Sequence, residues 1–468
     1  MNKPDANRLL NPGPLILDGE SLDPGLLVQA ARSIRPVVLS EAAWRRISIS
    51  RNIVNGIVES GHAAYGVTTG VGSQKDFKVS SEAIIRYNQR LITAHATRVP
   101  GPTLKPETVR AALIYMVNAF GCGFSGVSEA LVRLLLNRIK SDEMPEIDAS
   151  GSVGASDLVP LAQIAHWLLS SDEASSSGLP GAKEAISLIN SNAISLSIGA
   201  EQLVETEQLL STFDLTAAVS IEGFRGNPWA VSEQANASHR RKGQAKSAMA
   251  MRNCLAKSEL WQAGKPRFLQ DPLSFRCASQ VHGTAWEAYS RALDIWKVEL
   301  NSVHDNPIID VDAQTAISHG NMDSTGITLA IDSLRQALAK ICDLSGERLH
   351  KQQWPAFSGL PTGLSEEDSA VGGVQFLNLG HIAASLIAST KIWASPHLLI
   401  SVGQVADGVE DTAGYALHSV HDLNRLVDAA WNIVTVEMII SVWAILRRRL
   451  DIQSLGERVR HVVERLKP

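Results

Sequence analysis

The sequence has 468 residues, of which 45% are hydrophobic and 5% aromatic, and its formal net charge is -5. This material suffices for a large buried core. A mildly acidic chain without a long basic run is not typical of proteins that bind nucleic acid or an anionic membrane surface. Its four cysteines show no CxxC spacing and do not indicate a disulfide scaffold.

The sequence predicts a soluble, cytoplasmic protein. Its N-terminal segment contains no apolar stretch of signal-peptide length. The most membrane-like run, 429–446, holds Asn432 and Glu437 among its apolar residues, so we expect a buried helix there and no membrane span.

Residues 1–160 mix short elements, including a Gly/Thr-rich loop at 67–76 and a helix at 130–139. We expect this part and a long helical bundle over 161–468 to form one compact catalytic unit.

Long amphipathic helices dominate the rest of the sequence. Apolar residues recur every three or four positions in 326–349. The same spacing is found in 281–300, 374–393 and 423–450. The stripe in 326–349 consists of Ile327, Ile331, Leu334, Leu338 and Ile341. The sequence therefore predicts a mainly α, elongated bundle, and because one bundle cannot bury so many apolar helices, we expect subunits to associate.

Four stretches are rich enough in Gly, Asn, Ser and His to carry chemistry: 64–72, 151–160, 270–283 and 301–310. Each could instead be a tight turn between helices. Glycine-dense turns let the backbone approach a ligand, and amide or guanidinium groups can hold a carboxylate. The groups of this kind are Asn190, Gln270, Asn306 and Arg276. No phosphate-binding GxxxxGK and no metal-ligand spacing is present, so we expect neither a nucleotide nor a metal.

Taken together and in order, these stretches resemble the aromatic amino acid ammonia-lyases and aminomutases, the family of the histidine, phenylalanine and tyrosine ammonia-lyases. GSVGASDLVPLA at 151–162, for example, is similar to the family signature GSVGASGDLAPLA. The matching segments are YGVTTGVG (65–72), LITAHA (91–96), GCGFSGV (121–127), GSVGASDLVPLA, ISLINSN (186–192), QDPLSFRCASQVHG (270–283), NSVHDNP (301–307), SGLPTGL (358–364) and VEDTAG (409–414).

The resemblance implies roles for individual residues. Tyr65 matches the catalytic tyrosine that acts on the β-proton of the substrate. His95 matches a histidine that contacts the substrate side chain, and Arg276 matches the arginine that binds the substrate carboxylate. Glu410 matches an acidic residue near the substrate amine. Asn190 and Gln270 match polar residues around the prosthetic group.

The family makes its own electrophile, methylidene-imidazolone, from an Ala-Ser-Gly tripeptide whose glycine nitrogen attacks the alanine carbonyl. This sequence reads Ala155-Ser156-Asp157, and the glycine after the serine is missing. Closure would have to use the Asp157 nitrogen, beside a Cβ atom that obstructs the required backbone conformation. The prosthetic group is thus expected only if Ala155 and Ser156 are processed in spite of this.

Further departures concern the same pocket. They are Leu273 for a tyrosine, Met322-Asp323 for Phe-His and Gly408-Val409 for Asn-Gln. Three functions stay open: an ammonia-lyase for an amino acid with an aromatic or imidazole-like ring, a 2,3-aminomutase, and a paralogue with changed chemistry or with binding alone. The resemblance also implies a homotetramer whose sites draw on several subunits.

Overall fold

The computed structural model describes residues 13–33, 35–141, 143–366, 376–400 and 405–467, which form two compact units. Unit 1 consists of the described residues of Met1–Val204, Leu293–Leu329 and Pro396–His421. Unit 2 consists of those of Glu205–Ala292, Ala330–Ser395 and Asp422–Pro468. The division of the sequence near residue 160 stays a prediction.

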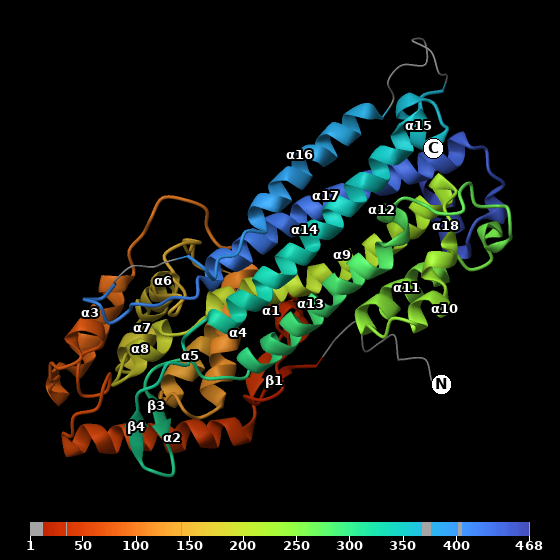
Figure 1. Cartoon of the computed structure of the whole chain (residues 1–468). Helices are drawn as coiled ribbons and strands as arrows, with labels where there is room; N and C mark the ends of the chain where they lie inside the picture. Colours follow the sequence, from red (N-terminus) through yellow and green to blue (C-terminus); the bar gives the residue numbers. More distant parts are fainter. Residues whose placement is uncertain (1–12, 34, 142, 367–375, 401–404, 468) are drawn as a thin grey trace. The chain divides into compact units, whose positions relative to one another are not determined.

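Unit 1 is mostly helical and carries two small sheets (Figure 1). Helix α4 (Pro106–Gly121) is its buried centre, since every residue from Thr108 to Gly121 is buried. Strands β1 and β2 pair in parallel, and β3 and β4 are antiparallel. The other bounds are β1 Leu15–Leu17, α1 Pro24–Ser33, β2 Val37–Leu39, α2 Glu41–Ser60, α3 Ile84–His95, α5 Glu129–Ile139, α6 Leu158–Leu169, α7 Asp172–Ser176, α8 Glu184–Ile189, β3 Ile308–Asp310 and β4 Thr315–Ile317.

The longest helices each contain a point where the chain passes from one unit to the other. They are α9 (Ala193–Phe224), α13 (Ala278–Glu299), α14 (Thr325–Gln353) and α17 (Ala416–Arg447). Together with α16 (Leu377–Trp393) they confirm the mainly α fold and the long helices predicted from apolar spacing. The remaining helices of unit 2 are α10 Glu233–Ala237, α11 Lys242–Cys254, α12 Leu273–Arg276, α15 Pro355–Ser358 and α18 Glu457–Leu466.

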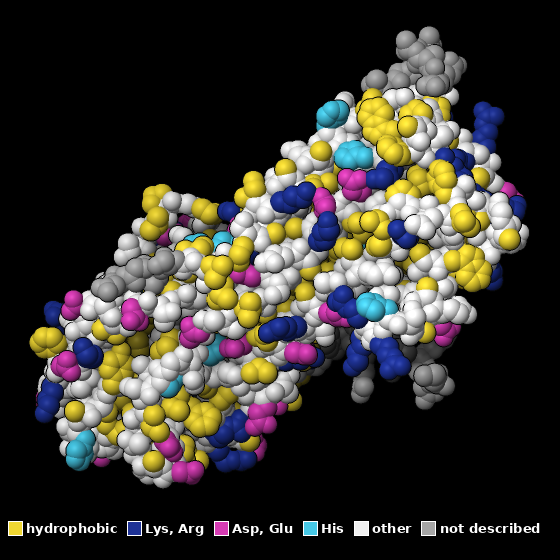
Figure 2. All heavy atoms as spheres, in the orientation of Figure 1, with side chains coloured by type: hydrophobic (Ala, Val, Ile, Leu, Met, Phe, Trp, Pro, Cys, Tyr) yellow, Lys and Arg dark blue, Asp and Glu magenta, His cyan; other side chains and the backbone are white. Residues whose placement is uncertain are grey.

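Short 3₁₀ turns complete both units. They are η2 Gly72–Gln74, η3 Ser81–Ala83, η4 Pro228–Val231, η5 Glu259–Trp261, η6 Thr362–Leu364 and η8 Ile452–Ser454. On the visible face of the molecule, acidic and basic side chains are largely interspersed (Figure 2).

Helix α17 holds a buried ion pair in unit 2. The guanidinium of Arg348 on α14 donates to the Glu437 carboxylate at 2.5 and 2.9 Å, and both side chains are fully buried. Ser220 of α9 and Ser345 of α14 donate to the same carboxylate. The parts of α9, α14 and α17 in this unit therefore lie side by side (Figure 1).

Among the described residues, α17 is the one helix long and apolar enough to cross a membrane, and 61% of its apolar window is buried within the protein. A fully paired glutamate in this helix is expected for the core helix of a globular protein.

Replacing Glu437 by glutamine should lower the free energy of unfolding by about 3–5 kcal/mol, because the Arg348 charge stays buried without a counter-charge. Chemical denaturation followed by circular dichroism measures this as a lower urea midpoint. The control is Glu464→Gln on the exposed side of α18, which should change stability by less than about 0.5 kcal/mol. Equal midpoints for the two variants would contradict the prediction.

Candidate active site

A cavity of about 790 Å³ in unit 1 brings together most of the residues singled out in the sequence. Its walls come from the loop after α2, from α3, from the segments around the starts of α6 and α14, from the end of α8 and from residues 406–412. The predicted site residues that line it are Tyr65, His95, Ala155, Asn190, Asn306 and Glu410.

The loop after α2 anchors Tyr65. The carbonyl of Ala64 accepts from the amides of Val67, Thr68 and Thr69, which folds the chain into a tight turn. The amide of Gly72 donates to the Tyr65 hydroxyl oxygen at 3.1 Å. A donor aimed at this oxygen stabilises negative charge on it, which is compatible with the proton-accepting role predicted for Tyr65.

A second phenol, Tyr87 on α3, lines the same cavity and was not anticipated from the sequence. The amide of Val71 donates to its hydroxyl oxygen at 3.1 Å. Burial raises the pKa of Tyr87, and negative charge on Tyr65 raises it further. The consecutive amides of Val71 and Gly72 therefore donate to the two phenols.

His95 and Glu410 lie at another part of the cavity wall. The Nδ1 atom of His95 lies 2.8 Å from the carbonyl oxygen of Leu91, and because a carbonyl only accepts, we assign the proton to Nδ1. Nε2 is then the ring nitrogen that remains for a ligand. Burial raises the pKa of Glu410, and the positive form of His95 lowers it, so the two groups are close enough to interact.

Ser156 is buried beneath the cavity in a strained conformation. Its φ of 84° lies in the left-handed region, which is costly for a residue with a Cβ atom. Asn190 donates through Nδ2 to the Ser156 hydroxyl at 2.6 Å and accepts from the amide of Asn306 at 2.8 Å. These side chains fix one another and hold the loop in place.

Asp157 occupies the junction between two helices. It directly precedes α6, and its amide donates to the carbonyl of Ser191 at 2.8 Å. Its fully buried carboxylate accepts from the amide and the hydroxyl of Ser195, at 2.8 and 2.9 Å, in the first turn of α9. Backbone amides in the first turn of a helix have no partner within that helix, so the Asp157 carboxylate caps α9. Burial raises the pKa of Asp157.

Methylidene-imidazolone does not fit this arrangement. Ring closure would require the Asp157 nitrogen to leave Ser191 and attack the Ala155 carbonyl, while the Asp157 side chain stays fixed on Ser195. Because the glycine is missing, one residue would have to supply both the nucleophilic nitrogen and the helix cap.

Three residues of the sequence departures, Met322, Asp323 and Val409, also line the cavity. Asp323 follows Met322 there, and its backbone forms an antiparallel bridge with Ala155. Together with Glu410 and Asp411, Asp323 gives the cavity wall three carboxyl groups.

Gln270 and Arg276 belong to unit 2 and are not among the described residues that line the cavity. With its oxygen turned toward Arg276, the Gln270 amide accepts from both terminal guanidinium nitrogens at 3.1 Å. Leu273, which lies on the same short helix as Arg276 (α12), is exposed. The roles predicted for Gln270 and Arg276 stay predictions.

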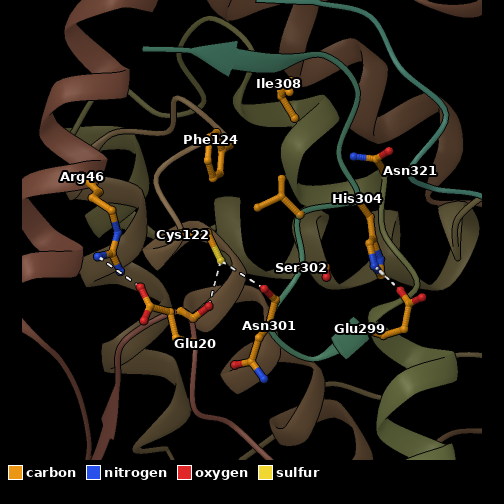
Figure 3. A pocket seen from close by; sticks show the side chains of 12 residues that line it. Glu20, Arg46, Cys122, Phe124, Glu299, Asn301, Ser302, His304, Ile308 and Asn321 are labelled. Carbon is orange, nitrogen blue, oxygen red and sulfur yellow. Dashed lines mark hydrogen bonds and ion pairs between the residues drawn. The ribbon is translucent and has the colours of Figure 1, made fainter. Parts of the chain in front are cut away.

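A second cavity of unit 1, of about 760 Å³, is a weaker candidate (Figure 3). His304 in its wall is already paired with Glu299 through Nε2 and with Tyr115 through Nδ1. Burial raises the pKa of Cys122 to about 11, so this thiol stays protonated at neutral pH and is a poor nucleophile.

Within the described ranges, no group of three or more His, Cys, Asp or Glu side chains could hold a metal ion.

Residues 22–468 match the aromatic amino acid lyase family. The chain belongs to that family. It is 32% identical to a histidine ammonia-lyase of Caldanaerobacter subterraneus over 84% of this chain and 80% of the relative. A Gloeobacter violaceus histidine ammonia-lyase is also 32% identical, over 95% of this chain and 90% of the relative.

Solved structures of lyases and aminomutases share the fold. The ergothionase of Treponema denticola, described as an ergothioneine degrading enzyme, has a TM-score of 0.89 and 27% identity over 96% of this chain and 93% of its own. Histidine ammonia-lyase of Trypanosoma cruzi has a TM-score of 0.84 and 25% identity over 97% and 89%. These relatives confirm the family and the carbon–nitrogen lyase class expected from the sequence.

We expect the mature chain to have the mass of its unmodified sequence, because the Asp157 amide and side chain hold the tripeptide in an open form. Ring closure and dehydration would together remove two waters. Intact-mass spectrometry with peptide mapping of residues 154–158 measures this directly. A two-water deficit in that peptide would contradict the prediction. A glycine inserted after Ser156 supplies a separate nitrogen and should restore at least partial cyclisation.

Proposed function

We propose that this protein is a carbon–nitrogen lyase that acts on an α-ammonio acid with an imidazole-like ring and works without methylidene-imidazolone. Tyr65 accepts the β-proton, and the Gly72 amide stabilises the phenolate before the transfer. His95 accepts from the ring N–H through Nε2. Glu410 lies near the ammonium group. Support comes from the gathering of these residues in one cavity and from the histidine ammonia-lyase relatives.

The observation that carries the proposal is the engaged amide of Asp157. Without the prosthetic group, none of the described residues that line the cavity is an electrophile that could capture the lone pair of a leaving amine. An ordinary ammonium group loses its proton to a base far more readily than a carbon atom does, and the resulting neutral amine is a poor leaving group. The substrate must therefore keep its positive charge on nitrogen by itself.

A quaternary ammonium group meets this requirement because it carries no proton to lose. When Tyr65 removes the β-proton, the electrons of the C–H bond form the double bond between Cα and Cβ. The electrons of the C–N bond stay on nitrogen, which leaves as a neutral tertiary amine. The products are an α,β-unsaturated acid and that amine, and no oxidant or further reactant is needed.

The cavity suits such a substrate. Carboxylates at Asp323, Glu410 and Asp411 favour a cation, and aromatic rings such as those of Tyr65 and Tyr87 bind quaternary ammonium groups through cation–π attraction. The ergothionase structure is described as a complex with desmethyl-ergothioneine sulfonic acid, and this name implies a methylated parent compound.

An aminomutase is less well supported, because it must retain the amine and return it to Cβ. A tertiary amine with no electrophile to hold it leaves the site instead.

A comparison of substrates tests the proposal. The Nα-trimethyl betaine of histidine should give imidazolylacrylate and trimethylamine, measured by ultraviolet absorbance and by mass spectrometry. Histidine, phenylalanine and tyrosine should react at least 100-fold more slowly, since each C–N bond would have to break without an electrophile. Tyr65→Phe should abolish the reaction. Turnover of histidine by a chain of unmodified mass would contradict the leaving-group argument, and binding without turnover of any of these compounds would favour a binding-only paralogue.

We further propose a cytoplasmic homotetramer in which Arg276 and Gln270 of a neighbouring subunit complete each site. The family resemblance and the amount of apolar helix support this assembly. Sedimentation velocity at micromolar concentration should show a species of about four times the chain mass. A stable monomer would exclude the assembly.

A further inference from the structure

The charges that line the cavity are unequal. Among its described lining residues, three are acidic, and the only permanent cation is Arg90. His319 also lines the cavity, but burial lowers its pKa, so it is mainly neutral at pH 7. A substrate carboxylate that enters this space meets three carboxyl groups, and Arg90 is the one described lining group that is always positively charged.

We propose that Arg90 binds the carboxylate of the substrate, a role that the sequence motifs do not assign to it. This inference rests on the proposed function, because an α-ammonio acid supplies the carboxylate. The planar guanidinium can give a carboxylate two parallel hydrogen bonds, which an ammonium group cannot do with the same geometry.

The position of Arg90 on α3 fits this role. The residues of α3 that line the cavity are Tyr87, Arg90, Leu91, Ala94 and His95, whose spacings of three and four place them on one face. Arg90 and His95 are five residues apart, which corresponds to about 7.5 Å along the helix axis. A zwitterion of the size of histidine can therefore contact both, with its ring at His95 and its carboxylate at Arg90.

Arg90 is also available for a ligand. Its side chain is exposed at the cavity, and no ion pair or hydrogen bond joins it to another side chain in the part of the chain that the structure describes. Arg276 differs, because Gln270 already occupies both of its terminal nitrogens. If Arg276 of a neighbouring subunit reaches the same carboxylate, Arg90 supplies a second cation to it.

The test compares two ligands that differ only in this charge: imidazolylacrylate and its primary amide. Calorimetry on the full-length protein should show that the wild type prefers the acid. In Arg90→Gln, the ratio of the two affinities should fall about 10- to 100-fold, as expected for lost charge-assisted hydrogen bonds. Arg90→Lys should restore part of the preference.

Arg86→Gln is the matched control, because Arg86 lies on the same helix, is exposed and does not line the cavity. It should leave the ratio unchanged. An unchanged ratio in Arg90→Gln, a loss confined to Arg276→Lys, or failure of the wild type to bind the acid would each overturn the inference.

Binding and turnover separate this inference from the proposed function. If the acid binds in an Arg90-dependent way but no betaine reacts, the proposed function fails and the carboxylate site stands. If the betaine reacts with the same KM in the wild type and in Arg90→Gln, the carboxylate site fails and the proposed function stands.

Discussion

The hydrogen bonds of Asp157 determine what chemistry the cavity can perform. Its carboxylate caps the first turn of α9 through Ser195, and its amide is held by the carbonyl of Ser191. Both interactions are buried, so breaking either would leave a polar group without a partner at a cost of about 1–3 kcal/mol. With the glycine present, the cap and the nucleophilic nitrogen would belong to different residues. Without the glycine, Asp157 would have to serve both as the helix cap and as the source of the nucleophilic nitrogen, and in the structure it forms the cap.

The rest of the loop is nevertheless fixed in one conformation by hydrogen bonds. Ser156 keeps a left-handed conformation that only surrounding contacts can maintain, and Asn190 links its hydroxyl to the backbone of Asn306. This network orders one wall of the cavity without supplying an electrophile. The wall can still position a substrate and exclude alternative poses, which is the part of catalysis that depends on geometry.

The sequence predicted the long helices well because their apolar spacing directly reflects burial. The structure brings Tyr65, His95 and Glu410, which the ordered motifs singled out, to one cavity, although they are far apart in the chain. Tyr87 and Arg90 were missed because motif matching weighs only matched positions. Their spacing from Leu91 and His95 on α3 was the available signal. No pattern in one chain shows whether Arg276 serves its own subunit or a neighbour.

Because no described residue that lines the cavity is an electrophile, the substrate itself must carry a nitrogen that can leave as a neutral amine. An enzyme with an electrophile can activate a primary amine, whereas a cavity of phenols, imidazoles and carboxylates can only bind, orient and remove a proton. It then discriminates among substrates by charge: a quaternary nitrogen remains cationic beside Tyr65 at any pH, while a primary amine does not. The carboxylates at Asp323, Glu410 and Asp411 favour that permanent cation, and they also repel the carboxylate on the adjacent carbon. One guanidinium in such a wall therefore does more than add affinity, because it determines which end of the zwitterion lies at Arg90 and which end lies at His95.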